Sequence, residues 1–85
     1  MSSVFKKYRM TRKNVLLLAQ AIINVYGKIA WQDYASDSAY PDQHSLTLNE
    51  IKGSPEKLER FRSEFTHQMY DNVINDEMQR LEHDI

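Results

Sequence analysis

The stretch from Thr11 to Ala35 limits the possible folds of this chain more than any other, because it holds the densest apolar cluster in the sequence. Its main apolar positions recur at helical spacing, at Leu18, Ile22, Val25 and Ile29. Apolar residues cover about half of the circumference when the stretch is wound at roughly 100° per residue. The opposite stripe is polar and contains Gln20, Asn24, Lys28 and Gln32. This pattern predicts a long helix over 11–35 that needs two packing partners.

Gly27 interrupts the predicted helix at a cost of about 1 kcal/mol relative to alanine. The glycine either marks a close contact within a continuous helix or ends the helix at Tyr26. Because Ile29, Ala30 and Trp31 continue the apolar pattern beyond it, we expect the helix to continue through Gly27.

Length and composition indicate a single helical domain over residues 1–85, with residues 1–10 as a basic N-terminal arm. Two glycines and two prolines offer little turn chemistry for a sheet of many strands. The chain has no cysteine, which excludes disulfides and Cys-ligated zinc and is compatible with a reducing compartment. Residues 15–31 are too short and too polar for a membrane span. They also do not suit a signal sequence, because the Ala-x-Ala site at Ala19 would leave an apolar core of only Val15–Leu18. We therefore expect a cytoplasmic protein without a membrane partner.

The second half of the chain carries clear helix-start signals. Residues 36–46 break every periodicity and predict a loop. A capping box over Thr47–Glu50 then predicts a short helix, which Gly53 ends in a left-handed conformation. Ser54 and Pro55 follow as the N-cap and first residue of a long helix that extends to about residue 82.

The apolar stripe of this last helix changes face along its length. The first stripe comprises Leu58, Phe61, Phe65, Met69 and Val73, and the second comprises Tyr70, Ile74, Met78, Leu81 and Ile85. Either a helix break near Asp71 and Asn72 or two different packing partners would explain the change. We favour two partners, because neither glycine nor proline is present there to break the helix.

These patterns predict an all-α fold in which a long helix, a loop, a short capped helix and a second long helix form an antiparallel hairpin. Two hairpins would pair into a dimeric helical bundle. Leu18, Phe61 and Phe65 are the predicted core residues. The predicted partner-binding residues are Tyr70, Ile74, Met78 and Leu81.

Residues able to support catalysis or metal binding are few. Glu64 and His67 have the Glu-x-x-His spacing of di-iron bundles, with Asp71 one turn further. The first helix supplies no carboxylate before Asp33, and the short helix supplies only Glu50. We therefore interpret these residues as a solvated, charge-paired face. His44 lies in the predicted loop without any recognisable triad partner. We therefore expect no metal site, no cofactor and no enzymatic activity.

Charge is divided sharply along the chain. Residues 1–32 carry six cations and no acid, and all twelve acids follow from Asp33 onward. The N-terminal cations Lys6, Lys7, Arg9, Arg12 and Lys13 are interleaved with Phe5 and Tyr8, as in segments that contact phosphates and stack on bases. However, the isoelectric point of about 6.3 is low for a nucleic-acid-binding protein. We expect these cations to pair instead with the acidic C-terminal end, at Asp76, Glu77, Glu82 and Asp84.

The sequence thus favours a small non-enzymatic module that acts in protein–protein interaction or regulation through helical surfaces, as a homodimer that also binds another protein. The alternative is a dimeric nucleic-acid-binding regulator that uses the basic N-terminal segment. A third class, a metal- or ligand-binding bundle, ranks below both.

Overall fold

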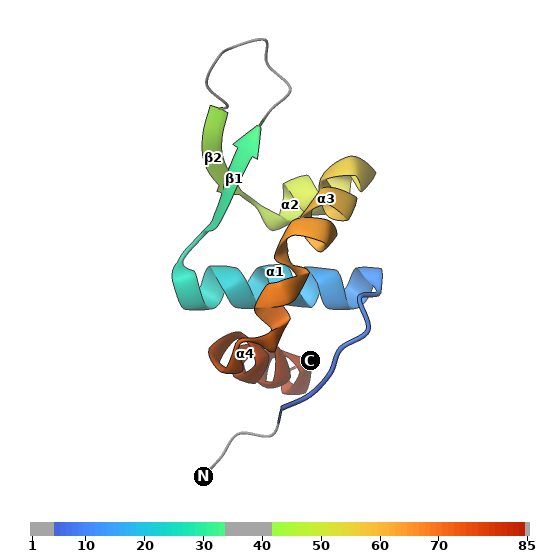
Figure 1. The fold of residues 1–85 in the computed structure, drawn as a ribbon, viewed down its shortest axis with the longest axis vertical. Coiled ribbons are helices and arrows are strands. Elements are labelled where there is room, and N and C mark those ends of the chain that lie inside the picture. The colour runs from blue at the N-terminus through green and yellow to red at the C-terminus, as the bar shows by residue number, and fades with distance from the viewer. Residues whose placement is uncertain (1–4, 34–41, 85) are drawn as a thin grey trace.

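The computed structural model describes residues 5–33 and 42–84. The elements are α1 (Arg12–Tyr26), β1 (Ile29–Asp33), β2 (Asp42–Leu46), α2 (Leu48–Gly53), α3 (Pro55–Phe65), the 3₁₀ helix η1 (Thr66–Tyr70) and α4 (Asn72–His83). The expected helical character is confirmed, since helices dominate the described residues (Figure 1). The fold also contains a small antiparallel sheet of β1 and β2, which the sequence analysis did not predict.

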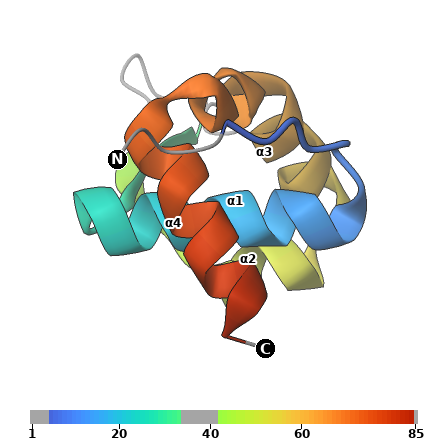
Figure 2. The ribbon, with the colours of Figure 1, turned by 90° about the horizontal axis from the view of Figure 1, so that it is seen from below.

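Helix α1 lies at the centre of the molecule. The layer of α2 and α3 lies on one side of it and α4 lies on the other (Figure 1), and α4 crosses α1 when the molecule is turned (Figure 2). Helix α1 also contacts η1 and β1. The two packing partners that the wide apolar face of α1 requires are therefore supplied by the same chain.

The prediction of a continuous helix through Gly27 is wrong. Helix α1 ends at Tyr26, and Gly27 adopts the left-handed conformation with φ of 86° while its N–H donates to the Ile23 carbonyl oxygen at 2.8 Å. From Ile29 the chain alternates as a strand, with Ile29 and Trp31 buried and Ala30 exposed. Beyond Gly27, every second residue therefore faces the core, as expected for a strand.

The predicted loop over 36–46 is partly wrong as well. Residues 42–46 form β2, which pairs with β1 so that Ile29 lies opposite Leu46 and Trp31 lies opposite His44. Residues 34–41, which include the predicted end of the first helix and the start of the loop, lie outside the described residues. The sequence gives no strand pattern for β2, because its residues are mostly polar and, within 44–46, only Leu46 is buried.

The prediction of one long helix over 55–82 is wrong too. Helix α3 ends at Phe65, η1 follows, and Asp71 caps α4 by accepting a hydrogen bond from the Val73 N–H at 2.8 Å. Thr66 also bonds back to the Arg62 carbonyl oxygen near the end of α3. Side-chain capping makes this break without glycine or proline. The apolar stripe changes face because α3 and α4 run in different directions.

The predicted helix starts are confirmed. The Thr11 hydroxyl accepts from the Asn14 N–H at 3.3 Å, the Thr47 hydroxyl from Glu50 N–H at 3.2 Å, and the Ser54 hydroxyl from Lys57 N–H at 3.3 Å. Gly53, however, is not left-handed, because Gly27 is the only positive-φ residue among those described. Extended Ser54 redirects the chain directly into α3.

One hydrophobic core joins the helices and the hairpin. It contains Val15, Leu18, Ile22, Ile29, Trp31, Leu46, Ile51, Phe61, Met69, Ile74 and Met78, together with Tyr8 and two alanines. The predicted core positions Leu18 and Phe61 are confirmed, each with 0% exposure. Phe65 lies at the core edge, half-buried, with its ring stacked on Phe61 at 4.9 Å between centroids.

Candidate functional site

The N-terminal arm is fastened to α4 by a buried asparagine. The Asn75 side chain is 1% exposed, accepts from the Lys6 N–H at 3.0 Å and donates to the Lys6 carbonyl oxygen at 2.7 Å. Its amide also donates to the Met69 carbonyl oxygen at 3.1 Å. Asn75 thus satisfies backbone groups of two segments that would otherwise be buried without partners.

Two residues of the arm pair with a single carboxylate near the C-terminus. The Lys6 ammonium lies 2.8 Å from Glu82, and the Tyr8 hydroxyl donates to the same carboxylate at 2.9 Å. These hydrogen bonds from Lys6 and Tyr8 lower the pKa of Glu82. Burial, followed by the contact with Glu82, raises the pKa of Tyr8. The predicted pairing between the arm and the acidic end is therefore present at Lys6.

The other cations of the basic segment are not paired in this way. Within residues 5–33 and 42–84, no ion pair involves Lys7, Arg9, Arg12 or Lys13, and all four are exposed. Two of the acids expected to meet them pair with Arg80 instead, Glu77 at 2.6 Å and Asp84 at 2.8 Å. The aromatic residues of the segment are also engaged within the fold, since Tyr8 is buried and Phe5 stacks on Tyr70 at 6.2 Å.

The residues predicted to bind a partner divide into two groups. Ile74 and Met78 are each 0% exposed and belong to the core of the chain itself, so their assignment as a partner surface is corrected. Tyr70 is 57% exposed, next to Val73 at 56%. Leu81 is half-buried and lines a cavity between three helices. The second apolar stripe therefore serves mainly to pack α4 within the fold.

The cavity beside Leu81 is a strongly apolar concave surface. Its volume is about 370 Å³, and its apolar lining comes from three helices: Leu16 and Leu17 of α1, Leu48 of α2 and Leu81 of α4. A second cavity of about 290 Å³ continues along α1 past Ile23 to Gly27. The two cavities share Gln20 and Leu48, and we refer to them together as the α1 groove.

The sequence analysis missed this groove. Leu16 and Ile23 flank Gln20 on the side of α1 that faces away from Leu18 and Ile22, as the helical period shows. That side was interpreted as a polar stripe. The available signal was the apolar residues on either side of Gln20, but only the tertiary structure shows that Leu48 and Leu81 extend them into a groove.

The charged residues of the groove are unequally compensated. Its carboxylates, Glu82 and Asp84, are paired with Lys6 and Arg80 at 2.8 Å each. Its ammonium groups are Lys13, Lys28 and Lys52, and no ion pair within the described part of the chain involves them. The groove therefore has an apolar floor and a rim with uncompensated positive charge.

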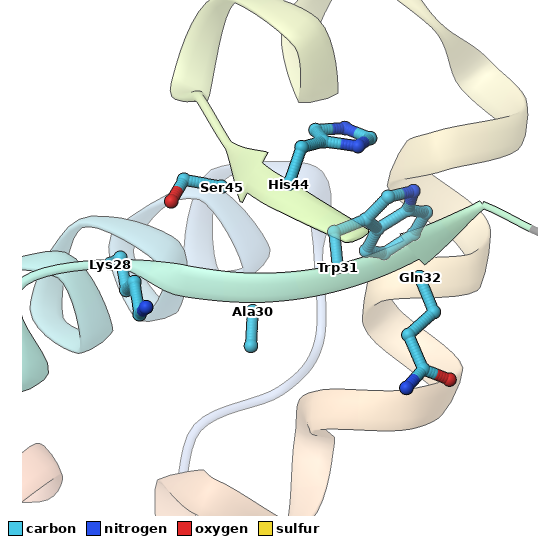
Figure 3. Close-up of a pocket in the computed structure, with 6 residues that line it drawn as sticks. All are labelled: Lys28, Ala30, Trp31, Gln32, His44 and Ser45. Atoms are coloured by element: carbon cyan, nitrogen blue, oxygen red, sulfur yellow. The ribbon is translucent and has the colours of Figure 1, made fainter. Parts of the chain in front are cut away.

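A third cavity, of about 390 Å³, lies on the hairpin (Figure 3). Its lining includes His44 and Ser45, but these are neighbours on one strand and point in different directions, so they form no nucleophile–base pair. His44 lies 3.4 Å from Glu50. Trp31 packs under the Arg60 guanidinium at 4.1 Å, a contact that joins the hairpin to α3.

The Glu-x-x-His spacing is not used as a helical site. Glu64 pairs with Arg60 at 3.0 Å on α3, His67 lies in η1, and Asp71 caps α4. The residues therefore belong to three elements rather than to one helical face. Across the described ranges, no group of three or more His, Cys, Asp or Glu side chains is arranged to hold a metal ion.

The fold and groove define the chain as a small, mainly helical domain with one β-hairpin and a leucine-lined surface groove. No helix in the described residues has the length and apolar character needed to cross a membrane. No protein-family model, curated protein or solved structure matches the chain.

Proposed function

We propose that the chain is a non-enzymatic interaction module that binds an amphipathic helix of another protein in the α1 groove. One observation carries the proposal: half-buried Leu16, Leu17, Ile23, Leu48 and Leu81 line two neighbouring cavities that share Gln20 and Leu48. A concave surface lined by leucine and isoleucine is the kind of surface on which an amphipathic helix places its apolar face. The proposal keeps the function expected from the sequence and moves its surface from Ile74 and Met78 to the groove.

The dimensions of the groove favour a helix as the occupant. It follows α1 from Lys13 to Gly27, a length of about 21 Å at 1.5 Å per residue. A partner helix of about four turns has the same length. Helices that bind in such grooves insert apolar side chains spaced by three or four residues, which fits a floor made of leucine and isoleucine.

A second copy of this chain is the competing occupant. The homodimer was predicted from the wide apolar face of α1 and the change of face in the last helix. Both features are accounted for inside one chain, because α1 is covered from two sides and the last helix is broken by η1. A partner protein therefore fits the groove better than a symmetric bundle does.

The test uses a synthetic amphipathic helix of about 15 residues, with leucines on one face and glutamine and alanine elsewhere. We expect it to shift backbone NMR resonances along α1, α2 and the end of α4. Leu16→Gln and Leu17→Gln should each weaken binding by roughly tenfold, since each removes apolar contact area from the complex. Val73→Gln, which changes an exposed apolar residue elsewhere, is the matched control.

Two results would contradict the proposal. The first is the absence of resonance shifts in the groove at any peptide concentration that leaves the peptide soluble. The second is self-association of the chain that Leu16→Gln abolishes, because a second copy would then be the occupant.

Nucleic-acid binding is the second candidate function, favoured by the exposed and unpaired Lys7, Arg9, Arg12 and Lys13. It ranks lower because Tyr8 is buried and Phe5 stacks on Tyr70, which leaves Phe5, at 41% exposure, as the part of the segment's aromatic surface open to base stacking. Binding of single- or double-stranded DNA that falls steeply with salt and is lost in Lys7→Glu and Arg9→Glu together would favour this alternative.

A further inference from the structure

We infer that the helix bound in the α1 groove is acidic, with an apolar stripe flanked by aspartate or glutamate at both ends. This inference rests on the function proposed for the groove and adds the chemistry of the partner. Its basis is the imbalance between compensated carboxylates and uncompensated ammonium groups on the rim.

The lysines are distributed along the whole groove. Lys13 and Lys52 line its first cavity, beside Leu16, Leu17 and Leu48, and Lys28 lines the second cavity beyond Ile23. Lys13 and Lys28 therefore lie near opposite ends of α1, about 15 residues apart, which is about 22 Å along a helix. Each lysine is exposed and reaches solvent next to apolar surface.

The acids of the rim do not offset these lysines. Glu82 is held by both Lys6 and Tyr8, and Asp84 accepts from the Arg80 guanidinium at 2.8 Å. A basic partner would have to displace Lys6 or Arg80 from these carboxylates and would also meet three lysines of its own sign. An acidic partner gains new pairs without breaking any of those in the fold.

The start of α1 adds to the preference for a negative partner. Arg12 and Lys13 occupy the first turn of the helix, which contains no acidic residue. Cations at this position oppose the helix macrodipole, whose positive end is the N-terminus. A carboxylate of the partner placed beside Lys13 would offset the unfavourable interaction between these cations and the helix macrodipole. The carboxylate would remain in solvent, where ion pairing carries little desolvation cost.

The test compares three peptides that share the same leucine stripe and differ in the flanking positions, which are glutamate, glutamine or lysine. At low salt we expect the glutamate peptide to bind about tenfold more tightly than the glutamine peptide, and the lysine peptide to bind most weakly. High salt should bring the three dissociation constants together, since it screens exposed pairs.

The double variant Lys13→Glu and Lys52→Glu should reverse the order of the glutamate and lysine peptides. The matched control, Lys7→Glu with Arg9→Glu, changes the net charge equally at exposed positions that do not line the groove and should keep the original order. Circular dichroism of each variant checks that the fold is retained.

The outcomes separate the two proposals. If all three peptides shift the groove resonances with equal affinity, the groove function stands and the acidic preference is overturned. If none binds, the groove function itself fails. If the control variant changes the order as much as the groove variant does, the preference comes from net charge and the inference is wrong. DNA that displaces the glutamate peptide and depends on Lys13 and Lys52 would also overturn it.

Discussion

Phe61 and Phe65 lie on adjacent turns of α3, yet their environments differ. The Phe61 side chain has no exposed surface, whereas Phe65 lies half-buried at the edge of the core and lines a surface cavity. The two rings stack on one another at 4.9 Å. Exposure, rather than residue type, therefore sets the contribution of each ring to stability.

We expect Phe61→Ala to lower the free energy of unfolding by roughly 3–5 kcal/mol, the usual cost of removing a buried phenylalanine. Phe65→Ala should cost less than half of that, because its cavity is open to solvent. Urea denaturation followed by circular dichroism measures both variants. Equal costs would show that Phe65 is as deeply packed as Phe61.

The lowered pKa of Glu77 predicts how the stability of the fold depends on pH. Hydrogen bonds from Arg80, and then from the Asn24 amide, lower the pKa of Glu77 from 4.5 to about 2. A carboxyl group whose pKa falls on folding stabilises the fold at pH values above its unfolded pKa and loses that contribution as the pH falls. We therefore expect Glu77→Gln to be destabilising at neutral pH, with a difference from the unmodified chain that shrinks as the pH falls from 4.5 towards 2.

Denaturant unfolding at several pH values measures this difference. Glu59→Gln serves as the control, because its side chain is 66% exposed and, among the described residues, its ion pair is with Arg62 on the same helix. Solvent screens such a pair, so its removal should change stability and pH dependence less. A difference for Glu77→Gln that grows on acidification would contradict the assignment.

At the scale of elements, single residues decide where helices end. Gly27 allows α1 to stop and β1 to begin, and Asp71 allows α4 to begin after η1. At both positions the apolar pattern of the sequence continues with helical spacing, but the chain changes direction. The apolar stripes on either side of them then face the same core, at Ile22 and Trp31 in the first case and at Phe61 and Ile74 in the second.

The two glycines provide a matched test of this point. Gly27→Ala should destabilise the fold by about 1–2 kcal/mol, because φ of 86° is unfavourable for any residue with a side chain, although no atom lies within 4 Å of the added carbon. Gly53→Ala meets no contact either and replaces the last residue of α2 by a better helix former, so it should be neutral or slightly stabilising. Thermal unfolding compares them, and the reverse order would contradict the assigned conformations.

At the scale of the whole molecule, α4 connects both ends of the chain to the core. It packs on α1, places Ile74 and Met78 in the core, holds the N-terminal arm through Asn75 and Glu82, and lines the groove with Leu81. The first cavity of the groove, which Leu81 lines, therefore forms only when α4 is docked on α1. Any partner that binds there stabilises the folded state through linkage.

The packing of α4 predicts that the effect of an added charge on the free energy of unfolding depends on whether the position is buried. Ile74→Asp should lower the free energy of unfolding by more than about 4 kcal/mol, since it buries a charge without a partner. Tyr70→Asp, at an exposed position, should change it by less than about 1 kcal/mol. Denaturation and native mass spectrometry together measure stability and subunit number. A folded Ile74→Asp chain with altered assembly would restore the original assignment of Ile74 to a partner surface.

The sequence by itself determined the starts of α1, α2 and α3 and much of the core, because these depend on neighbouring residues. Thr11, Thr47 and Ser54 cap helices through bonds to backbone groups three residues away. Leu18 and Phe61 are buried because helical spacing places them on apolar faces. The pairing of Lys6 with Glu82 also followed from the division of charge along the chain.

Only the tertiary structure decided which apolar faces are internal and which surface remains open. Helical and strand periods are both compatible with the few apolar residues after Gly27, and pairing with β2 selects the strand. Ile74 and Leu81 share one stripe, yet the crossing of α4 over α1 buries the first and leaves the second beside Leu16 and Leu48. The groove is formed by three segments that are distant in sequence, and their contact depends on packing that no local pattern encodes.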